Sequence, residues 1–395
     1  MTSPIKPQTL SHGGVFLPPR PELDTQKLPI KHISPEPGEF LYFHLSHNFF
    51  DIIKSDNDYK LNKRVLAGEL VWGNGKDGVY SSISGYVRGV YETMSSDGNL
   101  VDSICIENDG LDERAPRRPA ADPIAHVREQ ILDIARRSRI DVFIINAVEA
   151  DPFITGAGRL VIETGKKLMS GVRLLKQAFP KVAVIFAVSS TNREALDALD
   201  KEAGDNLARI LPIIPKYPQD SDKFIIKTCT GRNMSLVGMP SDVGCIVISP
   251  EELLALYESV TGKHFTEKII TLGGDAVREP GNYLVPIGLP FAALISAAGG
   301  LYERPAKIIC GNRMTGVELL DIETPVTKHS SALICLTEKE TVANTLRPSH
   351  CINCGKCAKV CPMRLTPYLP RKTDACVSCR CCAYICPSHC LTGES

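Results

Sequence analysis

Hydrophobic and polar positions change period along this chain, and each period predicts a different kind of element. Between residues 39 and 110, short apolar runs alternate with polar positions, as is typical of short β-strands. Turns that contain glycine and asparagine separate these runs, which cover residues 40–45, 64–73, 78–92 and 103–108. We therefore expect residues 39–110 to form a small all-β sandwich.

From residue 121 onward the apolar positions follow a helical period, interrupted by short and fully apolar runs. The predicted elements alternate in the order helix 121–138, strand 141–146, helix 160–179, strand 181–188 and helix 192–207. This alternation predicts parallel strands joined by helices that cover the sheet. We expect one α/β domain over residues 121–249.

Two flanking segments have their own patterns. Apolar runs at 268–274 and 283–287, followed by a short helix from Pro290, predict a small β-grasp domain over residues 262–335. Residues 1–38 are rich in proline and polar side chains, which predicts an extended arm rather than a packed unit.

Composition narrows the classes of function. The 395 residues are enough for roughly two to four domains. Lys and Arg together number 45, as do Asp and Glu, so no broad basic surface for nucleic acid or anionic lipid is expected. No apolar run approaches the length that crosses a bilayer, and the N-terminus has no hydrophobic signal core. We expect a soluble or peripheral protein in the cytoplasm, where cysteines stay reduced.

The strongest chemical signal lies at the end of the chain, where ten of the 15 cysteines fall within residues 351–395. Two runs, from Cys351 and from Cys376, share the spacing Cys-x2-Cys-x2-Cys-x3-Cys-Pro. This is the bacterial ferredoxin pattern for two [4Fe–4S] clusters, in which the fourth cysteine of each run ligates the other cluster. The predicted metal ligands are Cys351, Cys354, Cys357 and Cys386 for one cluster, and Cys376, Cys379, Cys382 and Cys361 for the other.

Zinc and disulfides are the competing interpretations of these cysteines. A structural zinc site closes with four ligands, usually as two separated Cys-x2-Cys pairs, and two four-cysteine runs that each end in Cys-Pro fit that pattern poorly. Cys381 and Cys390 fall outside both runs, and we interpret them as spare thiols or neighbours of the ligands. Single-electron transfer needs no general acid or base, so we predict no catalytic residue.

Several motifs upstream of the cysteine runs occur together in one family. In chain order they are Gly13-Gly14-x3-Pro18-Pro19, Asn146-Ala147-x-Glu149, Tyr217-Pro218-Gln219, Gly274-Asp275-Ala276-Val277-x2-Pro280-Gly281-Asn282 and Pro325-Val326-Thr327-Lys328. With the cysteine runs they resemble, over essentially the whole chain, the C subunit of the Rnf (also called Rsx) electron transport complex. The A subunit of the sodium-pumping quinone reductase shares the upstream parts but lacks the clusters.

The resemblance implies a fold, a place and partners. The fold class is multidomain α+β, with a biotinyl- or lipoyl-like β sandwich, a Rossmann-like α/β domain related to the flavin subunit of complex I, an SLBB-like β-grasp domain and a dicluster ferredoxin domain over residues 345–395. The implied place is the cytoplasmic face of the cell membrane, without a transmembrane segment of its own. The implied partners are the other Rnf subunits and ferredoxin, which would bind directly or through the B subunit of the complex.

One departure from the family bears on cofactors. Members that use NADH carry a glycine-rich loop before the first α/β strand, whose backbone N–H groups hold phosphates. Here the predicted helix leads directly into Asp141, and we interpret residues 155–159 as a turn with a solvated Arg159. The family's motif cysteine is Ala150, and Tyr217-Pro218-Gln219 continues into residues 220–223, Asp-Ser-Asp-Lys, where the family has Gly-Gly-Glu-Lys. We predict that FMN and NADH are both absent.

These observations predict an electron-transfer subunit that passes single electrons through two [4Fe–4S] clusters, between ferredoxin and an acceptor other than NAD. Use of an acceptor other than NAD resembles the archaeal type of Rnf complex. The complex would couple this electron flow to movement of Na+ or H+. One alternative is an FMN- and NADH-dependent input module of a soluble reductase. A second is a non-catalytic assembly module whose clusters only hold the fold.

Overall fold

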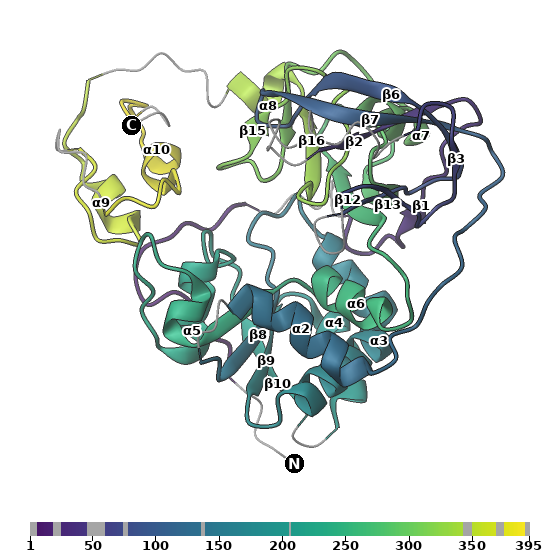
Figure 1. The fold of residues 1–395 in the computed structure, drawn as a ribbon. Helices are drawn as coiled ribbons and strands as arrows, with labels where there is room; N and C mark the ends of the chain where they lie inside the picture. The colour runs from purple at the N-terminus through teal and green to yellow at the C-terminus, as the bar shows by residue number, and fades with distance from the viewer. Residues whose placement is uncertain are drawn as a thin grey trace.

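The computed structural model describes residues 6–18, 25–45, 60–73, 78–135, 139–204, 207–342, 350–368 and 375–391. Pro19, the last residue of the first motif, lies outside them. Figure 1 shows an α/β domain at the bottom, a β-rich region above it and a yellow C-terminal lobe to the left. We call residues 350–391 the C-terminal lobe, and the rest of the chain the body.

The α/β domain is built on a four-stranded parallel sheet in the order β10-β9-β8-β11. Its strands are β8 (Val142–Ala147), β9 (Ala183–Ser189), β10 (Arg209–Ile213) and β11 (Cys245–Ile248). Numbered within the domain, this order is 3-2-1-4, the strand order of the first half of a doubly wound nucleotide-binding fold. Of these four strands, the sequence pattern above named only the counterparts of β8 and β9.

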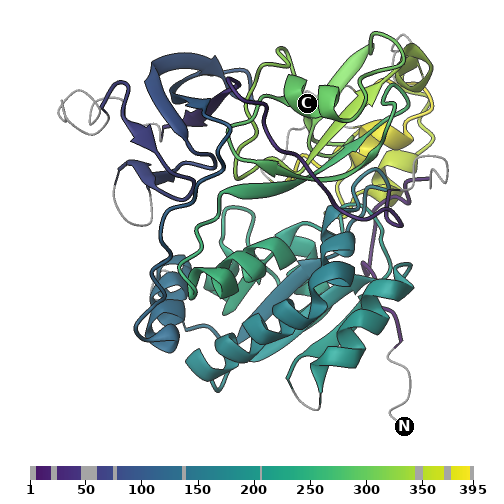
Figure 2. The same ribbon diagram turned by 90° about the vertical axis from the view of Figure 1, so that its right-hand side faces the viewer.

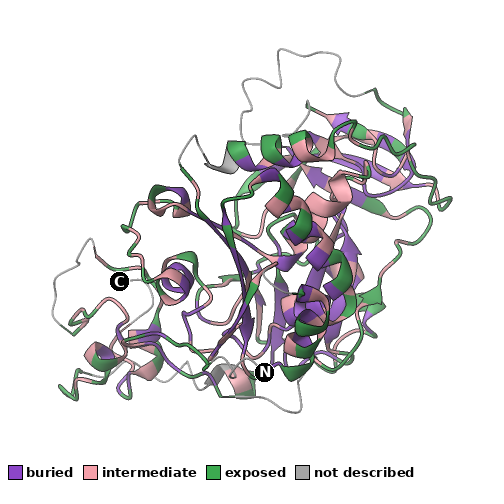
Figure 3. Cartoon of the chain, turned by 90° about the horizontal axis from the view of Figure 1, so that it is seen from below, coloured by how far each residue is buried: buried purple, intermediate pink, exposed green. Residues whose placement is uncertain are grey.

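Helices cover both faces of this sheet. One face packs against α2 (Pro123–Ala135), α3 (Gly156–Ala178), α4 (Arg193–Ala203) and α6 (Pro250–Ser259). The other face packs against α5 (Asp222–Thr230), and a short 3-10 helix, η3 (Pro240–Val243), leads into β11. Because both faces are covered, β8 and β9 are apolar almost throughout rather than alternating. Figure 3 shows buried residues gathered on the strands and exposed ones on the outer sides of the helices.

The β-rich region contains three sheets around one shared core. A four-stranded antiparallel sheet joins β2 (Phe40–His44), β7 (Leu100–Asn108), β6 (Gly85–Met94) and β3 (Arg64–Val65), and β4 (Leu70–Trp72) pairs with β5 (Val79–Tyr80). Leu41 and Phe43 of the first sheet belong to the same buried cluster as Tyr283 and Phe291 further along the chain. The predicted sandwich and β-grasp segments therefore pack as one unit.

The third sheet is mixed and has six strands in the order β1-β13-β12-β16-β14-β15. These are β1 (Lys31–His32), β12 (Glu267–Gly273), β13 (Gly281–Pro286), β14 (Lys307–Cys310), β15 (Val317–Glu318) and β16 (Ala332–Leu336), with α7 (Phe291–Ala297) and α8 (Glu338–Val342) beside them. The sheet is therefore larger than the two strands and one helix that the sequence pattern indicated.

The N-terminal arm, which was expected to be extended, lies along the body in its described residues. Strand β1 pairs in parallel with β13, and Gln8 bonds through its backbone to Pro212 and Ile214 beside β10. Both β10 and β13 would otherwise be edge strands with unpaired backbone groups, and the arm supplies their missing partners. Figure 2 follows the purple arm from the yellow lobe across the green mixed sheet.

The C-terminal lobe has two short helices, α9 (Lys356–Val360) and α10 (Cys381–Ile385), which pack on each other. Among the described residues, no helix combines the length and the apolar character that crossing a membrane requires.

Candidate functional site

The two cysteine runs fold into two nearly identical loops. In each loop the residue before the second cysteine has a positive φ, 54° at Asn353 and 49° at Ser378. The residue after that cysteine, Gly355 or Arg380, is also left-handed and caps the following helix, α9 or α10. In the first run, Cys351, Cys354 and Cys357 line the same cavity.

The first predicted ligand set surrounds a small cavity within the lobe. Cys351, Cys354, Cys357 and Cys386 all line it, together with Tyr368. Three of these cysteines come from the first run and the fourth from the second, the crossed arrangement that the spacing indicated.

The second predicted ligand set gathers on the side of the lobe that faces the body. Burial raises the pKa of Cys382 to about 11, and the neighbouring Cys379 and Cys376 contribute to the rise. The pKa of Cys381 is also raised, first by its hydrogen bond with Cys379 and by burial, and further by Cys382 and Cys361. Cys361, the last cysteine of the first run, therefore lies near Cys381 of the second loop.

Backbone N–H groups point at sulfur atoms in both sets. Asn353 N–H lies 3.4 Å from Cys351 Sγ, and Ser378 N–H lies 3.4 Å from Cys376 Sγ. Leu365 N–H lies 3.3 Å from Cys361 Sγ. Such donors stabilise thiolates and cluster sulfur, so the residues fit two iron–sulfur clusters. No three His, Cys, Asp or Glu side chains in the described ranges are placed to hold a single metal ion, and each thiolate around a cubane binds a different iron.

The two cysteines outside the runs occupy distinct places. Cys381 is fully buried between the lobe and the body, and its Sγ donates to the carbonyl oxygen of Tyr217 at 3.8 Å. Cys390 lines the cavity of the first set, with its Sγ 3.5 Å from Cys386 Sγ. One thiol thus helps to join the lobe to the body, and the other neighbours a predicted ligand.

The N-terminal arm joins the lobe to the α/β domain. Gly14 N–H donates to the carbonyl oxygen of Val360 at 2.8 Å, and Val15 exchanges backbone hydrogen bonds with Tyr217. At Gly13, where φ is +66°, a Cβ atom would lie 2.6 Å from the backbone of Cys361. Only glycine allows this approach, which explains why the first motif carries glycines at this point.

A second candidate site lies where the strand order of the parallel sheet reverses. The switch point falls between β8 and β11, and open α/β sheets bind ligands outside the carboxyl ends of their strands at such points. A cavity of about 270 Å³ opens there. It is lined by residues 148–151 after β8, 249–251 after β11 and the first turn of α3.

Each helix that begins at this cavity already has a carboxylate of the chain at its N-terminus. At the start of α3, Ala157 N–H and Gly158 N–H donate to the carboxyl group of Glu149 at 2.7 and 3.1 Å. Asp220 lies just before α5, and Glu252 closes a capping box with Ser249 at the start of α6. The backbone donors that would attract a phosphate are therefore occupied or screened by the chain itself.

The pKa values of two of these acids, Glu149 and Asp220, are strongly raised. Burial raises the pKa of Glu149 to about 8, although the N–H groups of Ala157 and Gly158 oppose the rise. Burial also raises the pKa of Asp220 to about 6. The one basic residue among the residues lining this cavity, Lys268, is paired with Glu251. The cavity thus offers an anion more acidic groups than cations.

Residues 155–159 differ from the predicted turn. They run into α3, which begins at Gly156, and the Arg159 guanidinium is not solvated but pairs with Glu163 at 2.7 Å. The helical pattern from Leu160 onward placed this helix start too late because glycines lead its first turn. Glu149 was missed as the group that occupies this turn, since sequence spacing alone does not show which side chain folds back onto a helix.

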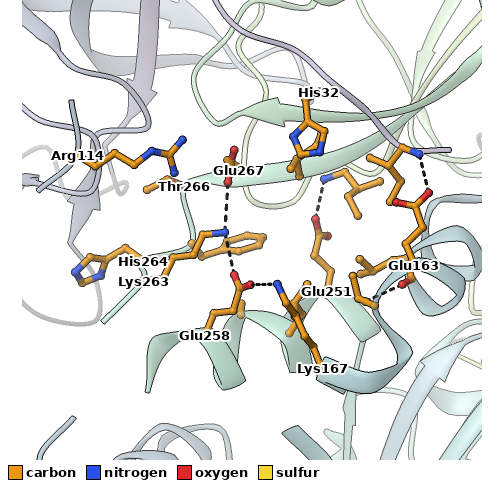
Figure 4. A pocket seen from close by; sticks show the side chains of 18 residues that line it. His32, Arg114, Glu163, Lys167, Glu251, Glu258, Lys263, His264, Thr266 and Glu267 are labelled. Carbon is orange, nitrogen blue, oxygen red and sulfur yellow. Dashed lines mark hydrogen bonds and ion pairs between the residues drawn. The ribbon is translucent and has the colours of Figure 1, made fainter. Parts of the chain in front are cut away.

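A third cavity, of about 450 Å³, lies between α3, α6 and the mixed sheet (Figure 4). Lys263 Nζ lies 2.9 Å from Glu258 and 3.5 Å from Glu267, and Lys167 Nζ lies 3.2 Å from Glu258. Although burial opposes ionisation, Lys263 and Lys167 hold the pKa of Glu258 below its ordinary value. We call Lys167, Glu258, Lys263 and Glu267 the interdomain seam, because they tie the α/β domain to the mixed sheet.

Comparison with known families divides the chain in a similar way. The family model described as Nuo51 FMN-binding domain matches residues 129–258, the SLBB domain matches 269–318, and the 4Fe-4S binding domain matches 345–364. These matches support a multidomain chain with a 4Fe-4S centre. The first match does not support the predicted absence of FMN.

Comparison with individual proteins points to one family. The C subunit of the Na(+)-translocating ferredoxin:NAD(+) oxidoreductase complex of Acetobacterium woodii is 31% identical over an alignment of 317 residues, and the match covers 73% of this chain and 70% of that protein. The proton-translocating counterpart from Clostridium ljungdahlii is 29% identical, covering 73% of this chain and 68% of that protein. The C subunit of the ion-translocating oxidoreductase complex of Rhodobacter capsulatus is 26% identical, covering 92% and 73%.

Proposed function

The chain belongs to the family of C subunits of Rnf-type ion-translocating oxidoreductase complexes, and from this premise we propose that it is the complex's peripheral electron conduit without a nucleotide site. It passes single electrons between ferredoxin and an acceptor other than NAD, on the cytoplasmic face of the membrane. The complex couples this flow to movement of Na+ or H+.

In this proposal the eight cysteines hold two [4Fe–4S] clusters in the crossed arrangement. Each cluster, when bound, takes up and releases one electron at a time. The chain's own residues supply the thiolates, the backbone N–H donors at Asn353, Ser378 and Leu365, and the contacts of Cys381 and Gly13 that fix the second set against the body. No proton transfer is required of any side chain.

The proposal rests on the switch-point cavity, where acidic side chains of the chain itself lie at the groups that would bind a phosphate. An FMN phosphate needs free backbone donors or cations, and those at the start of α3 are bound by Glu149 in either protonation state of that carboxyl. Asp220 adds a further acid, and Lys268 is paired. A chain without this site has no means of its own to deliver a hydride to NAD.

The alternative is an FMN- and NADH-dependent electron input module. The match of residues 129–258 to the FMN-binding domain favours it, because the α/β fold and the position of its crevice are retained. The two proposals differ in what the purified protein contains.

The deciding experiment measures iron, acid-labile sulfide and acid-released flavin in one anaerobically purified sample, and then adds NADH. The conduit predicts about eight iron atoms per chain, no flavin and no bleaching of the cluster absorbance by NADH. Stoichiometric FMN with bleaching by NADH would establish the input module instead. About four iron atoms would refute the assignment of two clusters.

A further inference from the structure

The C-terminal lobe has a charge asymmetry that the balanced chain as a whole lacks. Among its described residues, four basic side chains are exposed: Lys356, Lys359, Arg364 and Arg380. Described residues 350–368 and 375–391 include no Asp or Glu, so these cations have no acidic neighbour within that part of the lobe.

The two cysteine sets differ in how open they are. In the second set, Cys361 and Cys379 contact the body, at Gly13 and around Tyr217. Every described residue that lines the cavity of the first set belongs to the lobe itself. Cys351 and Cys354 of that set are exposed, whereas Cys376 is the one fully exposed cysteine of the second set. The first set is therefore the more open of the two to an outside partner.

The rim of the first set combines apolar and basic groups. Ile352 and Tyr368 line its cavity and are 63% and 41% exposed. Lys356 follows directly after the cavity residue Gly355, and Lys359 lies one turn further along α9. An apolar centre with cations beside it is the arrangement by which a protein surface recognises an acidic protein partner and speeds its approach.

We propose that this rim, formed by Ile352, Lys356, Lys359 and Tyr368, is the docking surface for an acidic one-electron carrier protein. The inference rests on the proposed function and names the partner class and its place of contact. One electron leaves the reduced carrier and reduces the centre held by the first cysteine set. No bond forms or breaks, and no proton moves.

The same lysines also offset the negative charge of a four-thiolate cluster, and this simpler role gives a different result on mutation. Loss of an offsetting charge alters the midpoint potential of the cluster. Loss of a docking charge alters the rate of association and its dependence on salt, because exposed charges are screened within about 10 Å at 0.1 M salt.

The test reduces the full-length holoprotein with a chemically reduced, acidic bacterial-type ferredoxin and follows cluster absorbance by stopped flow at increasing salt. The wild type should show a second-order rate that falls with salt. Lys356→Glu with Lys359→Glu should lower the low-salt rate by about 10-fold or more. The matched control, Lys181→Glu with Lys201→Glu, makes the same charge change at exposed positions of the α/β domain and should react like the wild type.

Iron content and EPR-monitored midpoint potentials of both variants show whether the clusters are intact and unshifted. A docking variant that keeps the wild-type rate and salt dependence would overturn the proposal, as would a rate change explained wholly by a shifted potential. Loss of binding to anionic phospholipid vesicles, with an unchanged ferredoxin rate, would assign the lysines to a membrane surface instead. A wild type that dithionite reduces and ferredoxin does not would refute the proposed function as well.

Discussion

At the scale of single residues, the fourth cysteine of each run has a different neighbour. Cys386 lies 3.5 Å from the thiol of Cys390, and in the other loop the corresponding position is Leu365, which offers only its backbone N–H to Cys361. Hydrogen bonds to cluster sulfur are among the factors that set reduction potential. The two centres are therefore expected to be tuned separately.

Replacing Cys390 by alanine should lower the midpoint potential of the centre held by Cys351, Cys354, Cys357 and Cys386 and leave the other unchanged, because one donor to a ligand sulfur is lost. An EPR-monitored redox titration measures both potentials. Cys310→Ala, a thiol in β14, is the control. Two unshifted potentials in Cys390→Ala would contradict the assigned contact.

The pKa of Glu149 predicts how the stability of the folded chain depends on pH. Its pKa is raised to about 8 in the folded chain, above the ordinary value of about 4.3. The folded state therefore holds a proton that the unfolded state has lost, so stability falls as pH rises between these values. Glu149→Gln should remove that fall with pH, and should be less stable than the wild type at acid pH because its amide group accepts only one of the two N–H bonds.

Infrared spectroscopy detects whether the carboxyl group of Glu149 is protonated. The wild type should show a protonated carboxyl band at pH 7 that titrates near pH 8 and is missing in Glu149→Gln. The exposed Glu303→Gln should retain the band. A wild type with no such band would mean that the two N–H donors and the helix terminus outweigh burial.

At the scale of elements, the arm and the lobe meet through backbone atoms. Gly13→Ala would place a methyl group 2.6 Å from the backbone of Cys361, in a left-handed conformation that costs about 1–3 kcal/mol for a residue with a side chain. The lobe should detach while its clusters remain, seen as faster hydrogen exchange at Gly14 and Val15 with unchanged iron content. Gly231→Ala has a similar positive φ but no atom within 4 Å of its Cβ, and should leave these amides protected.

These contacts also show what the sequence could and could not predict. The spacing of the cysteines was enough to propose both ligand sets, because each run fixes its own loop geometry within a few residues. The packing of the arm was not predictable, since Gln8 bonds beside β10 and Lys31 pairs with Tyr283, partners that no local period indicates. Strand β11 was missed because four apolar residues are too few for a period.

At the scale of the whole molecule, the interdomain seam links acid sensitivity to the joining of domains. The pKa of Glu258 is held below its ordinary value in the folded chain. Its ion pairs therefore stabilise the folded state fully above about pH 4.3, and this stabilisation is lost as the pH falls through the lowered pKa of the folded state. Glu258→Gln should lose roughly 1 kcal/mol at pH 7, with a smaller difference from wild type at acid pH.

Hydrogen exchange in α6 and β12, the elements that carry the interdomain seam, measures this loss of stability at neutral and at acid pH. Glu303→Gln, at an exposed position of the β-rich region, is the control and should show no pH-dependent difference. Equal protection of α6 in wild type and Glu258→Gln at neutral pH would show that the seam contributes nothing to the joining of the domains.

The arm has a consequence for how the protein is made. Gly14 and Lys31 are synthesised long before their partners Val360 and Tyr283, which lie far along the chain. Contacts between such distant parts of a chain close slowly, after the intervening segments have folded. We therefore expect the cysteine lobe to be filled with iron and sulfide before the arm fastens it to the body.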